Sequence, residues 1–226
     1  MANAIDKVNG IAIADIEAIN GKTDANIQAF NGKEFTGVTD AHVFIADNSS
    51  DTSILGDITF SLDSTYDVYE FEFVNIHARS DSVYFTFQVN ATGDSGYATS
   101  PVTSSMFAAF HDDPGEGTFA DMYYDTTHDN ANTTGDGEDQ TRLSVFCNAS
   151  DAEASLSGKM TLYAPSSGTY VKHFMSRISN FKKDPAESDT HVAGYINDTT
   201  AIDDIRFQMS SGNLDGLIRM YGIKKS

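Results

Sequence analysis

The chain has 226 residues and a formal net charge of −19 at pH 7, from 14 lysines and arginines against 33 aspartates and glutamates. A field of this sign repels phosphate backbones, so we expect no nucleic-acid binding. The single cysteine, Cys147, excludes an intrachain disulfide, and no apolar stretch approaches the roughly 18 residues of a membrane-spanning helix, so we expect no membrane contact.

Residues 1–36 predict an arm built from short repeats. They lack the basic and apolar regions of a signal peptide, so we expect synthesis in the cytoplasm. A motif Ile-x-x-apolar-Asn-Gly occurs three times at intervals of eleven residues. Its paired apolar residues are Ile5 and Val8, Ile16 and Ile19, and Ile27 and Phe30.

The repeat allows two local structures. Apolar residues three apart share one face of a helical turn, and Gly accepts the left-handed conformation that ends a helix, so we favour short helical turns. Alternatively, each Asn-Gly is the tight turn of a hairpin between two short strands. In either case a unit of eleven residues cannot bury its own apolar pair. We therefore predict that the six apolar residues are assembly residues, docked on the chain's own β-domain or, as we favour, on a neighbouring subunit.

Residues 37–226 predict a β-domain. In the segment 66–76, Tyr69, Phe71 and Phe73 face one way and Glu70 and Glu72 the other, as in a half-buried strand. Similar strands are expected at 82–89, 142–147, 156–163, 171–178, 190–196, 202–209 and 217–223. Polar Gly/Asp/Ser/Asn turns separate them, and no helix is expected between them. The fold class is therefore all-β, an antiparallel β-sandwich resembling a jelly roll, preceded by the arm.

The least structured stretch of the domain is 111–140, a length that is typical of a functional or disordered loop. Oxygen ligands for calcium occur there at Asp112, Asp113 and Glu116, and at Asp136, Glu138 and Asp139. Neither group matches an EF-hand loop, so we favour solvated loops and expect no metal site.

Signatures of catalysis are missing from the sequence. The six histidines have no zinc-ligand spacing, and there is no Gly-x-Ser-x-Gly, Walker or dinucleotide motif. Neighbouring carboxylates such as Asp203 and Asp204 are expected by chance in so acidic a chain. We expect a protein that is not an enzyme, binds no cofactor, and keeps Cys147 as a buried, inert thiol.

Three tyrosines are candidates for binding a glycan. Tyr123 and Tyr124 follow a Gly-rich loop, and Tyr97 lies near a turn. Adjacent strand residues point to opposite faces, so we expect one of the pair to be exposed. There is no tryptophan, which would have strengthened the case. We favour core or hydrogen-bonded roles and keep glycan binding as the alternative.

Two segments and the early core resemble a known group of proteins. Residues 8–21 resemble leaders on virion structural proteins of marine tailed phages, including cyanophages, and residues 205–223 look like the closing hairpin of their β-sandwich domains. Residues 66–89 are similar to the early core of those domains. The resemblance implies a phage virion structural protein: a capsid decoration, head or neck fibre, or tail appendage.

The same resemblance implies partners and a location. It implies other virion proteins as partners and a homo-oligomer, with a trimer favoured, located in the virion. It carries no catalytic residues over to this chain. The alternative function is a glycan-binding adhesin module that contacts the host surface.

Overall fold

The fold is known from a computed structural model that describes residues 42–97, 99–112, 120–124, 126, 129–133, 140–182 and 186–223, and six short strands between residues 7 and 34. The chain divides into two compact units, Met1–Ala41 and His42–Ser226, a few residues beyond the boundary expected at 36. In the part described there is no α-helix. Accordingly, none of the described residues form a helix that is long and apolar enough to cross a bilayer.

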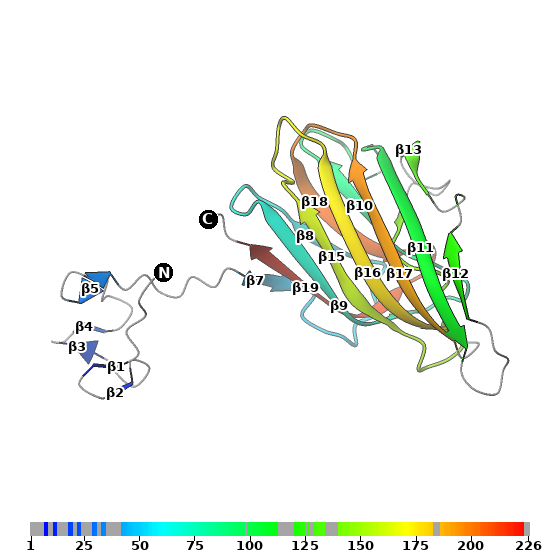
Figure 1. Cartoon of the computed structure of the whole chain (residues 1–226), viewed down its shortest axis with the longest axis horizontal. Coiled ribbons are helices and arrows are strands. Elements are labelled where there is room, and N and C mark those ends of the chain that lie inside the picture. The colour runs from blue at the N-terminus through cyan, green and yellow to red at the C-terminus, as the bar shows by residue number, and fades with distance from the viewer. Residues whose placement is uncertain are drawn as a thin grey trace. The chain divides into compact units, whose positions relative to one another are not determined.

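The second unit consists of two antiparallel sheets. The large sheet has the order β12-β11-β17-β16-β15-β9-β19-β7, with β13 also paired to β11, and the small sheet has the order β14-β10-β18-β8. In Figure 1 the large sheet lies in front and β10 and β18 lie behind it. The large sheet comprises β7 (His42–Asp47), β9 (Val68–Ala78), β11 (Val102–Asp112), β12 (Ala120–Tyr124), β13 (Ala131–Thr133), β15 (Leu156–Tyr163), β16 (Lys172–Lys182), β17 (Ala186–Ile196) and β19 (Leu214–Ile223). The small sheet comprises β8 (Asp57–Ser61), β10 (Phe85–Ala91), β14 (Thr141–Arg142) and β18 (Ile202–Met209).

An aromatic core joins the two sheets. Phe207 of β18 lies with its ring centroid 5.0 Å from that of Phe71 and 5.2 Å from that of Phe73, both on β9. Phe87 of β10 meets Phe174 of β16 at 4.9 Å. Along β9, alternation places Phe71 and Phe73 between the sheets and leaves Glu70 and Glu72 on the other face. The expected antiparallel β-sandwich is therefore confirmed.

Two expectations about the domain need correction. The segment 142–147 is not a strand: only Arg142 belongs to β14, and Cys147 forms an isolated bridge with Val83. The stretch 111–140 also contains structure, because β12 and β13 both pair with β11. These short edge strands were missed because they have few residues and no buried alternation, all of β12 being exposed.

The first unit contains three short hairpins where we favoured helical turns. The hairpins are β1 (Lys7–Val8) with β2 (Ile11–Ala12), β3 (Ala18–Ile19) with β4 (Lys22–Thr23), and β5 (Ala29–Phe30) with β6 (Lys33–Glu34). Two residues, Asn-Gly in every copy, separate the strands of each hairpin in the sequence. Asn-Gly is the preferred two-residue hairpin connection, whereas nucleating one helical turn fixes many dihedrals for a single hydrogen bond.

Candidate functional site

The arm contains half of the predicted assembly residues in described positions. Val8, Ile19 and Phe30 each end the first strand of a hairpin, opposite Ile11, Lys22 and Lys33. Ile5, Ile16 and Ile27 lie outside the described residues. The repeat of eleven residues in sequence is thus a repeat of one structural unit.

Each hairpin of the arm is very small. Among the described residues, each strand of a hairpin pairs with the other at two positions. An isolated two-stranded hairpin is at best marginally stable in water, even with longer strands. The hairpins therefore need contacts beyond their own paired residues to persist.

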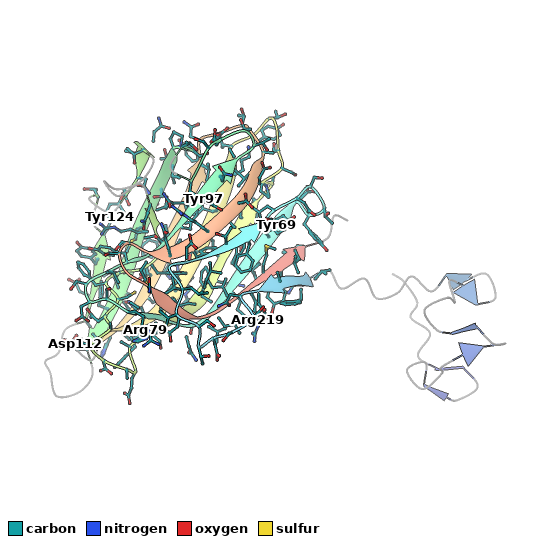
Figure 2. All side chains as sticks on the ribbon, turned by 180° about the vertical axis from the view of Figure 1, so that it is seen from behind. Tyr69, Arg79, Tyr97, Asp112, Tyr124 and Arg219 are labelled. Atoms are coloured by element: carbon teal, nitrogen blue, oxygen red, sulfur yellow. The ribbon has the colours of Figure 1, made fainter. Side chains whose placement is uncertain are left out.

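The three candidate tyrosines do not form one surface. The Arg206 guanidinium lies 4.4 Å from the centroid of the Tyr97 ring, on the outer side of the small sheet. Tyr124 pairs with Phe107 at the free edge of the large sheet, and Figure 2 shows Tyr97 and Tyr124 well apart. The Tyr124 hydroxyl donates to Asp129 at 2.7 Å, which raises the pKa of Tyr124. Glycan binding stays a prediction for each tyrosine separately.

Tyr123 and Tyr124 face opposite ways, as expected. Tyr123 lies opposite the buried Ala108 and packs edge-on against Phe110, with 6.1 Å between ring centroids. Both tyrosines are exposed, at 41% and 59%. We expected one of the pair to be exposed, and the other is exposed as well, because β12 is an edge strand and lacks a neighbour on one side in the described sheet.

Ion pairs cover the face of the large sheet that points away from the core, here named the outer face. The Arg177 guanidinium donates two hydrogen bonds to the Asp189 carboxylate, from Nε at 2.9 Å and from Nη2 at 2.7 Å. This pair lowers the pKa of Asp189 and raises that of Arg177. The other pairs are Lys159 with Glu70 at 3.2 Å, Arg219 with Glu72 at 3.0 Å, and Arg79 with Asp215 at 2.7 Å. A hollow of about 530 Å³ lies between the Arg177–Asp189 and Lys159–Glu70 pairs, and Glu72 also lines it.

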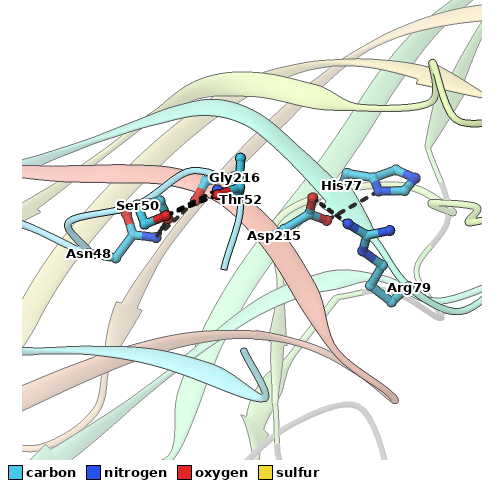
Figure 3. A network of polar contacts seen from close by, with 7 residues as sticks. All are labelled: Asn48, Ser50, Thr52, His77, Arg79, Asp215 and Gly216. Carbon is cyan, nitrogen blue, oxygen red and sulfur yellow. Dashed lines mark hydrogen bonds and ion pairs between the residues drawn. The ribbon is translucent and has the colours of Figure 1, made fainter. Parts of the chain in front are cut away.

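A β-bulge organises one end of the outer face. The pairing of β19 with β9 shifts between Asp215 and Leu217, where Gly216 has φ 119° and Asn75 of β9 has φ 51°. Asp215 then accepts a hydrogen bond from Arg79 at 2.7 Å and lies 3.2 Å from His77 Nδ1 (Figure 3). Bulges often re-aim side chains beside functional sites, so this cluster is a candidate site.

Asn48, in the loop after β7, connects this loop to β19 through side-chain hydrogen bonds. Its Nδ2 donates to the carbonyl oxygens of Gly216 at 2.8 Å and Ser50 at 3.0 Å (Figure 3). Its Oδ1 accepts from the backbone N–H of Ile218 at 2.9 Å. One side chain thus satisfies backbone groups of β19 beyond the point where its pairing with β7 ends, at Asp47.

The bulge cluster has few means for chemistry. His77 Nε2 is buried and has no hydrogen-bond partner among the described residues. A histidine that activates a nucleophile is hydrogen-bonded to its hydroxyl or thiol, and no such group contacts His77 in the described part of the chain. The described part of the chain holds no group of three His, Cys, Asp or Glu side chains that could bind a metal.

Of the candidate calcium ligands named from the sequence, only Asp112 is described, at the end of β11. Asp113, Glu116, Asp136, Glu138 and Asp139 lie outside the described residues.

Cys147 is the buried thiol that we expected. It is 5% exposed, and burial raises its pKa to about 11. A thiol with this pKa is almost entirely protonated at neutral pH and is a poor nucleophile. Cys147 is therefore a packing residue.

Sequence reasoning missed the outer face as a surface. Its exposed Phe107 and Met175 belong to strands in which they alternate with buried residues. The period-two pattern of 171–178 could have identified Met175, whereas Phe107 lies in a strand that was not expected.

The chain matches no protein-family model, no curated protein and no solved structure in the three comparisons that we made. A function must therefore be inferred from its own hairpins and surfaces.

Proposed function

We propose that the chain is a structural component of a larger particle, a phage virion, and that residues 1–41 anchor it to a neighbouring chain. The observation that carries this proposal is the series of three hairpins, repeated every eleven residues, in a unit separate from the sandwich. A series of similar small units suits repeated contacts along another chain better than catalysis at one point.

The size of the hairpins supports an external partner. Ordering a residue costs roughly 1–2 kcal/mol of backbone entropy, which two residue pairs per hairpin do not offset. Short strands also leave backbone N–H and C=O groups free to pair with another chain's strand. Docking on a neighbour supplies both the burial and the hydrogen bonds.

The sandwich supports the same role. Its described core runs from Ile58 to Met220 within the second unit, and packs the two sheets against each other. The net charge of −19 keeps such a domain soluble when it projects from a particle. The virion is the particle that we propose because residues 8–21, 66–89 and 205–223 resemble those of phage structural proteins.

The apolar hairpin residues offer a direct test in the full-length chain. Val8→Ser, Ile19→Ser and Phe30→Ser together remove the large apolar side chain from each first strand. The matched control, Ala12→Ser, Ala18→Ser and Ala29→Ser, changes small residues of the same hairpins. Both proteins are examined by sedimentation and by immunogold labelling of phage particles made with the variant gene.

The proposal predicts labelled particles for the native and control chains and unlabelled particles for the apolar variant. An apolar variant that is incorporated at the native level would show that the arm is not the anchor. Particles that carry no label even with the native chain would refute the virion assignment.

A further inference from the structure

We propose that the outer face of the large sheet binds a second copy of this chain, so that two sandwiches pair sheet to sheet. The inference goes beyond the arm, because it concerns the other unit of the chain. Four properties of the face carry it: exposed apolar side chains, a low net charge, internally paired ions, and sufficient area.

Large apolar side chains are concentrated on this face. Met175 is 57% exposed near the middle of the sheet, and Phe107 is 43% exposed on β11. The others are Phe44, Met122, Tyr124 and Tyr163. Aromatic residues, Met and Arg are the residue types enriched in protein–protein interfaces.

The net charge of the face identifies a second copy as the occupant. Four cations stand against six carboxylates on it, Asp47, Glu70, Glu72, Glu187, Asp189 and Asp215, so the face carries −2 with histidines neutral. The whole chain carries −19, so the remainder carries −17. Two copies that approach through other surfaces repel each other, whereas two outer faces meet with little repulsion.

The ions of the face are already paired before association. Each of the four cations, Arg79, Lys159, Arg177 and Arg219, contacts a carboxylate at 2.7–3.2 Å. Burying a charge is costly when its partner is missing, and each of these four cations has its carboxylate. A partner can therefore cover this face without burying any of the four cations unpaired.

The charged strands are also complementary to themselves. β15 carries Lys159, and its neighbour β9 carries Glu70 and Glu72. A two-fold axis running between these strands lays β15 of each copy over β9 of the other. The lysine of each copy then meets the carboxylates of the other, which fixes the register of the pair.

The face is large enough for a stable pair. Eight strands lie side by side in it. At about 4.8 Å between strands and roughly eight residues of 3.4 Å per strand, it covers about 900 Å². A standard interface buries about 800 Å² per partner, and two sheets pack face to face when aligned within about 30°.

Sedimentation of full-length variants tests the pairing. The arm variant Val8→Ser/Ile19→Ser/Phe30→Ser serves as background, so that association through the arm does not obscure the result. In it we expect a two-chain species, distinct in mass from the trimer implied by the resemblance to phage proteins. Adding Met175→Asp, or separately Phe107→Asp, places a charge in the interface and weakens the pair at least about 10-fold. Tyr170→Asp, at a residue 73% exposed in the loop before β16, leaves it unchanged.

Cross-linking identifies the surface itself. With a short bismaleimide, Thr161→Cys on β15 of the outer face yields cross-linked dimers, whereas Thr59→Cys on β8 of the small sheet does not. A chain that stays monomeric at about 100 µM, or a pair that both aspartates leave intact, overturns the proposal. Glycan binding to a monomer that is abolished by Phe107→Asp would also overturn it, because the face would then have another occupant.

Discussion

Cys147 shows how burial sets the behaviour of one residue. Its thiol lies 5% exposed, with a pKa raised to about 11. We expect Ellman's reagent at pH 8 to leave the native protein unlabelled over minutes, and to label one thiol per chain at once in denaturant. Fast labelling of the native chain would mean that this part of the sandwich opens readily.

Gly216 is a position where no side chain fits. Its φ is +119°, and a Cβ there would lie 2.6 Å from the backbone oxygen of Asn75. We predict that Gly216→Ala lowers the free energy of unfolding by roughly 3 kcal/mol, measured by urea denaturation. Gly93→Ala is the control, since Gly93 also has positive φ but has nothing within 4 Å of the added carbon. Equal losses for both variants would mean that conformation alone, without the clash, determines the cost.

Some residues could not be placed from sequence. Lys172 is fully buried, and its Nζ donates to the carbonyl oxygens of Asp198 at 2.9 Å and Thr200 at 2.5 Å. A lysine gives no signal of such a role, because carbonyl partners 26 and 28 residues away are defined only by the fold. The partners of the outer face are hidden for the same reason: Arg219 and Glu72 are 147 residues apart.

Strands differ in how clearly the sequence reveals them. β15 and β18 were predicted at their observed bounds, because apolar residues alternate with polar ones along most of each strand, from Met160 in β15 and from Ile205 in β18. β11 was missed because Ser104 is buried in it while Phe107 is 43% exposed, which inverts the usual pattern. In the arm, the choice between turn and hairpin was wrong, since apolar spacing was given more weight than the preference of Asn-Gly for hairpins.

The strand β18 links the sheets through Phe207. Its ring contacts those of Phe60, Phe71, Phe73 and Phe85, and it is fully buried. We predict a loss of about 3–5 kcal/mol in unfolding free energy for Phe207→Ala. Phe44→Ala, at a side chain 54% exposed on an edge strand, should lose a small fraction of that. Comparable losses would argue against the assigned core.

The whole molecule should lose stability at both extremes of pH. Hydrogen bonds from Tyr69 and Thr65 hold the pKa of Asp63 below 3.8, and Arg177 does the same for Asp189. A lowered carboxyl pKa stabilises the fold above the unfolded value, and this contribution disappears as pH falls through the folded value. Burial raises the pKa of Tyr69 from 10.0 to about 12, so its contribution is full below pH 10 and is lost as pH rises towards 12. Urea midpoints that do not change between pH 7 and pH 3 would contradict the acid limb.

At the scale of the assembly, we propose that the hairpins of residues 7–34 are stable only when docked on another chain. Hydrogen exchange followed by mass spectrometry measures this in the unmodified protein. In a solution dilute enough to keep the chain monomeric by sedimentation, the arm's amides should exchange within seconds while those of β9 and β18 stay protected. In purified particles the arm's amides should become protected as well. Strong protection of the arm in the monomer would contradict the account, because the hairpins would then be stable without a neighbour.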